Sequence, residues 1–307
     1  MDFKNLKGVI PPIITPVLKN EEVDEVGFRK LLTFCVNNGV HGIFIAGTNG
    51  ETMALTQKQR NNAIKIALDE VDKRVPVMCG VMDTGTKRVI ENIKELEQMG
   101  GEIAVVTTDF YSRHSCEAEI LRHFEHIAKN TNIKIMIYNI PPFVGTNISN
   151  QIVFKIAEFE NVIGYKDSAG NFAQLQNCLQ YFENKNRDFK ILVGATELAA
   201  AAMLQGAHGY IPSMAQVFPK LFVKLYEAAG KKDIDETKRL NKLVCKTSKI
   251  LKISKNATAA TKYAISLHGF TNKRVLMPAE PTTPEDEKKI REIVDEIKED
   301  LRQIKLL

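Results

Sequence analysis

The chain has 307 residues, of which 44% are hydrophobic and 26% are charged, and its formal net charge is +5. This length allows a large core in one or two domains. The basic residues are scattered and Trp is absent, which argues against a nucleic-acid-binding surface. The chain has no run of about 18 apolar residues, so we expect no membrane-spanning helix. Five scattered cysteines without a C-x-x-C pair predict free thiols and a cytoplasmic location.

Apolar, β-rich runs recur along the chain, with helical patterns between them. The eight runs are Gly8–Val17, His41–Gly47, Pro76–Val81, Ile103–Thr108, Lys134–Ile140, Val162–Lys166, Lys190–Ala195 and His208–Met214. Strand and helix in regular alternation predict parallel strands and a closed α/β fold, the (β/α)8 TIM barrel. An open, doubly wound sheet is the alternative, but no G-x-G-x-x-G turn follows the first run.

The chain becomes helical after the eighth run. Its last helix is predicted to begin at Thr283, followed by a proline in the first turn. One helix is enough to complete the barrel, so we assign residues 1–224 to a catalytic barrel domain and residues 225–307 to a C-terminal helical appendage. The connection over residues 271–284 contains three prolines, and we expect it to lie across the surface.

The sixth run ends with a lysine, at the barrel edge where catalytic groups lie. Strand alternation predicts that Lys166 shares a face with Val162 and Gly164, while Ile163 and Tyr165 take the other face. An amine at the end of an apolar strand loses hydration, which lowers its pKa. Such an amine can form a Schiff base with a keto acid. The alternative is a lysine that reaches from the strand end into solvent.

Two other runs end in polar groups. Gly47–Glu51 places two glycines around a polar pair, which leaves backbone N–H groups free for an anion, although an ordinary tight turn is the alternative. Tyr138 is predicted to share the inner face with Met136, either as a reactive group or as barrel filling. No His, Asp, Glu or Cys cluster has metal-ligand spacing. We expect His123 and His126 to be solvated and no metal to be required.

Three motifs occur in the order and spacing of a known family. They are Gly47-Thr48-x-Gly50-Glu51, Tyr138-Asn139-Ile140-Pro141 and Gly164-x-Lys166-Asp167-Ser168. With these motifs the chain resembles the dihydrodipicolinate synthase/N-acetylneuraminate lyase family over nearly its whole length. The resemblance implies a barrel with a C-terminal helical part, usually assembled as a homotetramer, a dimer of dimers. It also implies pyruvate or another 2-keto acid as the partner of the lysine, and no cofactor.

The resemblance further implies catalytic roles for four residues. Lys166 forms the imine, Tyr138 transfers a proton and Thr48 orients Tyr138. Tyr111 matches a tyrosine that, in several members, crosses into the neighbouring subunit to complete a proton relay; a surface aromatic at an interface is the alternative. The implied substrate-binding residues are Thr48, Asn49, Ser168, Gly194, Glu197, Ile211 and Ser213.

Departures from the family pattern concern the second substrate. Synthase members carry an arginine that holds the carboxylate of the aldehyde, where this chain has Phe143. Glu197 and Ser213 align with positions that bind a polyhydroxylated tail in sialic-acid lyases. We therefore expect a polar pocket and a lyase that cleaves a 2-keto-3-deoxy sugar acid or an N-acetylneuraminate-like substrate to pyruvate and an aldehyde. The alternatives are dihydrodipicolinate synthase, which condenses pyruvate with an amino-aldehyde, a dehydratase or hydratase-aldolase, and a non-catalytic keto-acid-binding protein.

Overall fold

The computed structural model of the chain describes residues 6–112, 114, 116–183, 185 and 187–306. The strands in this part of the chain are β1 (Gly8–Val9), β2 (Ile43–Ile45), β3 (Val77–Gly80), β4 (Ile103–Val106), β5 (Lys134–Asn139), β6 (Val162–Asp167), β7 (Lys190–Val193) and β8 (Gly209–Tyr210). They form one eight-stranded parallel sheet in the order β1-β8-β7-β6-β5-β4-β3-β2. The predicted repetition of strands is thus confirmed.

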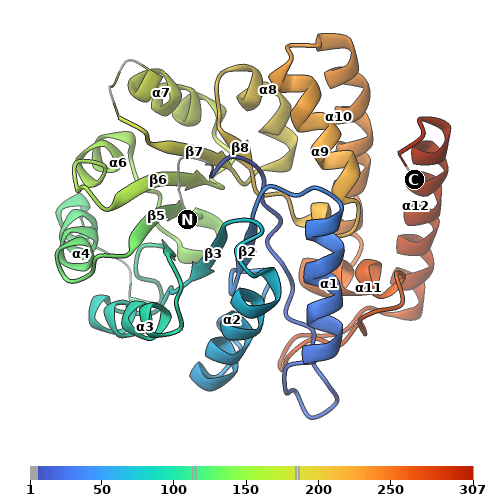
Figure 1. The fold of residues 1–307 in the computed structure, drawn as a ribbon, viewed down its shortest axis with the longest axis horizontal. Coiled ribbons are helices and arrows are strands. Elements are labelled where there is room, and N and C mark those ends of the chain that lie inside the picture. The colour runs from blue at the N-terminus through green and yellow to red at the C-terminus, as the bar shows by residue number, and fades with distance from the viewer. Residues whose placement is uncertain (1–5, 113, 115, 184, 186, 307) are drawn as a thin grey trace.

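Helices separate the strands and continue beyond the last one. They are α1 (Glu25–Asn37), α2 (Gln57–Val71), α3 (Thr86–Gln98), α4 (Glu117–Lys129), α5 (Pro141–Val144), α6 (Asn150–Ile156), α7 (Phe172–Glu183), α8 (Ala199–Leu204), α9 (Pro219–Gly230), α10 (Ile234–Ser248), α11 (Ala257–Ser266) and α12 (Pro284–Gln303). Figure 1 shows the earlier helices arranged around the strands, with α10, α11 and α12 gathered at one side. None of the described helices combines the length and apolar character needed to cross a membrane.

The barrel closes between its first and second strands through a few specific bonds. Phe44 bridges to Pro12, and its amide donates to the carbonyl of Pro11 at 3.0 Å. On the other side of this segment, the side chain of Gln216, which follows β8, donates to the Pro12 carbonyl and accepts from the Ile14 amide, both at 2.9 Å. Gln216 is fully buried, so these bonds satisfy an amide that would otherwise be costly to bury. The closed (β/α)8 barrel predicted from the sequence is confirmed.

An irregularity in β6 changes which of its side chains face inward. The register with β5 slips at Met136, which leaves Ile163 as an extra residue in the manner of a β-bulge. Ile163 and Met136 lie in the cluster that fills the barrel, whereas Val162 lies in the larger cluster between strands and helices. The prediction that Val162 shares the face of Lys166 is therefore wrong, and the inward position of Met136 is confirmed.

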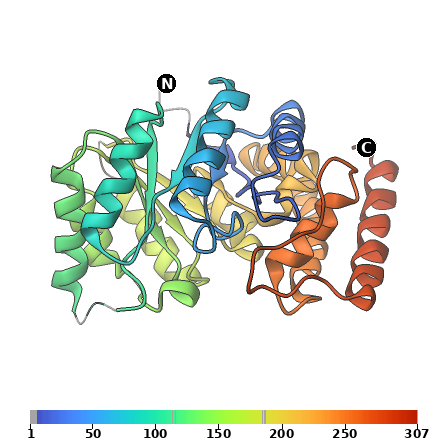
Figure 2. The same cartoon turned by 90° about the horizontal axis from the view of Figure 1, so that it is seen from below.

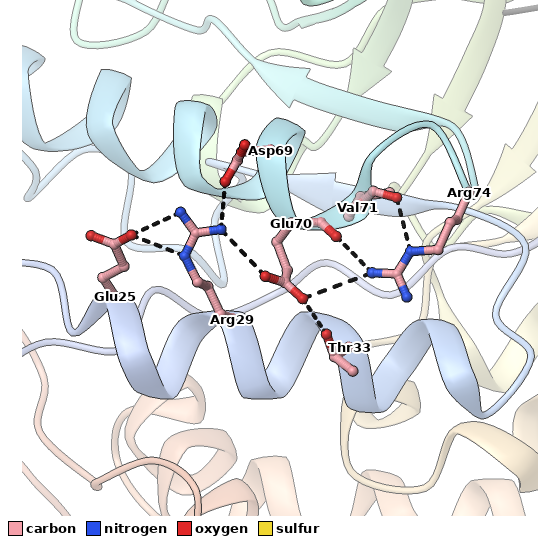
Figure 3. Close-up of polar contacts among 7 residues, drawn as sticks. All are labelled: Glu25, Arg29, Thr33, Asp69, Glu70, Val71 and Arg74. Atoms are coloured by element: carbon pink, nitrogen blue, oxygen red, sulfur yellow. Dashed lines mark hydrogen bonds and ion pairs between the residues drawn. The ribbon is translucent and has the colours of Figure 1, made fainter.

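A charged network ties α1 to α2 (Figure 3). Arg29 of α1 binds Glu25 on its own helix and reaches Asp69 and Glu70 of α2 at 2.7 and 3.3 Å. The hydrogen bonds that the Arg29 guanidinium donates to Glu25 and Asp69 raise its pKa. Arg74 approaches Glu70 from the other side at 3.8 Å. The network ties the C-terminal end of α2 to α1.

The C-terminal region contributes buried residues as well as surface helices. Helix α12 begins after the N-cap Thr283, as predicted, and forms the outermost element at the C-terminal end (Figure 2). The connection over residues 271–284 was expected to lie on the surface, but Leu276 is 3% exposed and packs in an apolar cluster. The predicted boundary between residues 224 and 225 falls within α9, so the division into two domains stays a prediction.

Candidate active site

Lys166 and Tyr138 lie next to each other because the β5–β6 register pairs them. The Lys166 amine lies 3.6 Å from the centre of the Tyr138 ring and 4.5 Å from the centre of the Phe44 ring. Lys166 is only 3% exposed, and burial lowers the pKa of its amine well below the usual value. A neutral amine is the nucleophile that Schiff-base chemistry requires. The reading of Lys166 as a lysine reaching into solvent is wrong.

The Tyr138 hydroxyl lies between two other hydroxyl groups. Burial raises the pKa of Tyr138 to about 12, although hydrogen bonds with Thr48 and Ser168 act in the opposite direction. The phenol is therefore protonated at neutral pH and is held in place from two sides, as a proton donor must be. Ser168 fits because Gly194 has no side chain: a Cβ there would lie 1.8 Å from the Ser168 hydroxyl oxygen.

The loop after β2 presents backbone N–H groups. The amides of Gly50 and Thr52 donate hydrogen bonds to the Gly47 carbonyl, at 3.0 and 3.4 Å. Within the described part of the chain, the amides of Thr48 and Asn49 donate to no acceptor. Successive free amides of this kind can bind a carboxylate. The Asn49 side chain accepts a hydrogen bond from the Ser213 hydroxyl at 3.0 Å, which links this loop to the end of β8.

A buried polar network behind the strands fixes the end of β6. The Asp167 carboxylate accepts from the Asn139 side chain and from the Tyr165 hydroxyl, both at 3.0 Å, and from the Ala169 amide at 3.3 Å. Burial raises the pKa of Asp167, against these hydrogen bonds. The network holds the turn that carries Ser168 toward Tyr138.

Three other predicted site residues lie in different surroundings. Ile211 is buried in the barrel interior, whereas Glu197 is exposed on a short 3-10 helix. Tyr111 is 95% exposed, so within one chain its side chain does not join the buried Lys166. Its φ is 71°. The roles predicted for these three residues stay predictions.

His123 is buried rather than solvated, which corrects the sequence prediction. Its Nε2 lies 3.1 Å from the Thr107 carbonyl, and its Nδ1 lies 2.9 Å from the Thr86 hydroxyl and 3.2 Å from the Asp109 carboxylate. Burial lowers the pKa of His123 to about 4. The hydrogen bonds to Thr107 and Thr86 tie α4 to the end of β4, just before Phe110 and Tyr111, and to the start of α3. Among the described residues, no group of three or more His, Cys, Asp or Glu side chains could hold a metal ion.

A cavity of about 280 Å³ opens in front of Tyr138 and Thr48. Its wall is formed by loops at the C-terminal ends of the strands and by residues 276–279 of the connection before α12. Neither Glu197 nor Ser213 is among its described lining residues, most of which are apolar. The expectation of a polar, sugar-like pocket does not describe this cavity.

An ion pair that sequence analysis missed lies beneath the cavity wall. Lys262 of α11 contacts the Glu51 carboxylate, and Glu51 also accepts a hydrogen bond from the Leu276 amide at 2.9 Å. The only sequence signal was the position of Glu51 in the glycine-bracketed motif. Phe44, which lies beside the Lys166 amine, was also missed; its signal was its place on the inward face of the second run.

Comparison with known proteins identifies the family and the fold of the chain. The model of the dihydrodipicolinate synthetase family matches residues 5–298. The chain belongs to this family. Its members are class I aldolases, so this family member is an enzyme of the lyase class. The resemblance stated from the three motifs is thereby confirmed.

Individual relatives of this family member match it over nearly their whole length. It is 30% identical over 294 residues to the 4-hydroxy-tetrahydrodipicolinate synthase of Kosmotoga olearia, covering 96% of this chain and 98% of the relative. The dihydrodipicolinate synthase structure from Bacteroides thetaiotaomicron has a TM-score of 0.90 at 30% identity, with coverage of 95% and 98%. YagE, a prophage protein from E. coli K12 solved in complex with pyruvate, has a TM-score of 0.91 at 26% identity, with coverage of 95% and 98%.

Proposed function

We propose that this chain is a pyruvate-dependent aldolase that works through a Schiff base on Lys166. The observation that carries the proposal is the buried Lys166 amine, 3.6 Å from the centre of the Tyr138 ring. The pyruvate complex of YagE supports pyruvate as the first substrate. The names of the relatives favour the synthase alternative, in which pyruvate is joined to an aldehyde, over cleavage of a sugar acid.

The mechanism follows from the positions of the polar groups. The Lys166 amine attacks the keto carbon of pyruvate, and the adduct loses water to give an iminium. The methyl carbon then loses a proton to give an enamine, which attacks the aldehyde carbon. The alkoxide formed on the aldehyde takes up a proton, and water releases the product and the free amine. We assign the proton transfers to the Tyr138 hydroxyl, which Thr48 and Ser168 hold, and the substrate carboxylate to the Thr48 and Asn49 amides.

A trapping experiment tests this proposal. Wild-type protein incubated with pyruvate and borohydride should show one reduced adduct by intact mass. Lys166→Ala should show none, whereas Lys190→Met, which changes another buried lysine, should retain the adduct. An adduct that persists in Lys166→Ala would remove Lys166 from the mechanism. A wild-type protein that forms no adduct with any 2-keto acid would instead support the non-catalytic binding protein.

Tyr111 is proposed to act in a neighbouring subunit of a homotetramer. Its side chain is 95% exposed in the single chain, and its φ of 71° is strained for a bulky residue. Mixing Tyr111→Phe subunits with Lys166→Ala subunits tests this arrangement. Activity should return in the mixture, because some sites combine an intact lysine with an intact tyrosine. A mixture as inactive as its parents would restrict Tyr111 to its own subunit.

Sugar-acid cleavage is the second candidate on the same imine. It is favoured by Phe143, which cannot form the ion pair that an arginine makes with the carboxylate of the synthase's aldehyde. Against it, Glu197 and Ser213, the residues expected to bind the sugar chain, do not line the cavity in front of Tyr138. Release of pyruvate from a 2-keto-3-deoxy sugar acid would support this candidate, and its absence alongside pyruvate consumption with an aldehyde would exclude it.

The free cysteines agree with a location in the reducing cytoplasm.

A further inference from the structure

Apolar side chains dominate the cavity in front of Tyr138. Its wall includes six large apolar side chains contributed by five separate loops or segments. They are Met53, Met82, Phe110, Phe143, Leu276 and Met277. Thioether and aromatic groups of this kind adapt to flat or flexible apolar ligands.

Positive charge is missing from the same wall. The described lining residues include no Lys, Arg or His, and their only carboxylate belongs to Glu51. That carboxylate is 8% exposed and already paired with Lys262. A second carboxylate, on a substrate, would lose its hydration here without gaining a cation, which is strongly unfavourable.

Three of these apolar side chains are unusually exposed. Met53, Phe143 and Met277 expose 55%, 68% and 72% of their surface, and all three line this cavity. Large apolar groups gathered at one opening mark a binding surface. Tyr138 lines the same cavity, and its ring centre lies 3.6 Å from the Lys166 amine, so a ligand in the opening lies next to the residue that adjoins the reacting lysine.

We propose that the second substrate is an uncharged aldehyde with an apolar alkyl or aryl substituent. This inference rests on the proposed function, since the cavity serves the imine on Lys166. The substituent packs against Phe143, Met53 and Met277, with the carbonyl carbon toward the enamine. A bond forms between the pyruvate methyl carbon and the aldehyde carbon, and the aldehyde oxygen takes up a proton. The product is a 4-hydroxy-2-keto acid with an apolar end, and no other reactant is needed.

A matched panel of aldehydes tests this inference. Pyruvate consumption is measured with benzaldehyde and hexanal, with the hydroxylated glyceraldehyde, and with the carboxylated succinic semialdehyde. The apolar aldehydes should have kcat/KM values at least roughly tenfold higher, the scale of small apolar contacts in a pocket. Equal or higher values for glyceraldehyde or succinic semialdehyde would overturn the inference.

Position 143 allows a sharper comparison. Phe143→Arg adds a cation to the wall and should shift the preference toward succinic semialdehyde by at least roughly tenfold. Ile234→Arg makes the same change in charge at an exposed site on α10 and should leave the ranking unchanged. Both variants should form the pyruvate adduct normally. An unchanged ranking in Phe143→Arg would overturn the inference, whereas failure of the wild-type adduct would overturn the proposed function itself.

Discussion

Lys262 of α11 and Glu51 of the β2 loop form an ion pair from which water is excluded. The Lys262 side chain is 0% exposed and that of Glu51 is 8% exposed. Burial lowers the pKa of Lys262, while Glu51 raises it. Because desolvation offsets much of the attraction in such a pair, its main effect is to fix geometry. Here it fixes the loop carrying Thr48 against the C-terminal helices.

Lys262→Met should therefore weaken both the fold and substrate binding. The variant leaves the Glu51 carboxylate buried and unpaired, which costs about 3–5 kcal/mol of unfolding free energy. The KM for pyruvate should rise because the Thr48 amide is no longer held. Lys246→Met removes a half-buried pair with Asp300 and should cost no more than about 1 kcal/mol. Urea denaturation measures the unfolding free energy of both variants, and steady-state kinetics measures their KM for pyruvate. Equal effects in the two variants would contradict a positioning role for Lys262.

The rate of imine formation should depend on pH through the Lys166 amine. Only the neutral amine attacks pyruvate, so the trapping rate falls as the pH falls through the folded-state pKa. Burial lowers this pKa, and the midpoint should lie well below 10.5. Phe44→Asn places a polar group near the amine and should raise the midpoint. Borohydride trapping over a range of pH measures the midpoint in each protein. A wild-type midpoint near 10.5 would mean that the Lys166 amine is hydrated.

Tyr138→Phe should lose turnover but keep its stability. The variant preserves the ring and removes only the hydroxyl, and general acid–base groups contribute about 10²–10⁴-fold in rate. The unfolding free energy should change by only about 1 kcal/mol. Thr48→Val and Ser168→Ala should lose less, because each leaves one of the two hydrogen bonds to the phenol. Near-normal turnover in Tyr138→Phe would mean that water or the substrate carries the proton.

His123 should make the fold less stable in acid. Its pKa is lowered from 6.5 to about 4, so between these values the unfolded chain binds more protons. The stability that neutral His123 provides is complete above pH 6.5 and is lost as the pH falls toward 4, on the order of 3 kcal/mol in total. Asp109 and His114 face the same ring. Urea denaturation should show a shallower pH dependence in His123→Gln, but not in His126→Gln on the exposed face of α4.

The neighbouring positions of Lys166 and Tyr138 could be predicted. Each residue lies near the C-terminal end of an apolar run, and the two runs form adjacent parallel strands. The bulge at Ile163 could not be predicted, since an extra residue between apolar neighbours leaves the hydrophobic pattern unchanged. His123 offered a usable signal: it shares a helix face with Phe124 and Ile127, which are buried.

The rest of the site depends on contacts between distant segments. Nothing in the sequence around Lys262 distinguishes it from the many exposed helical lysines, because its burial is set by Glu51 and by the packing of α11. The wall at Leu276 was missed for a similar reason. A proline-rich connection has no periodicity that shows which of its side chains turn inward.

Residues 276–279 place part of the cavity wall outside the barrel. Strand ends supply Lys166, Tyr138 and the Thr48 loop, whereas this stretch belongs to a connection without strand pairing. Insertions or substitutions there leave every hydrogen-bonded ladder of the sheet intact. The choice of aldehyde can therefore diverge among relatives while the imine chemistry stays constant. A chimera that receives this connection and position 143 from a relative should inherit the aldehyde range of that relative.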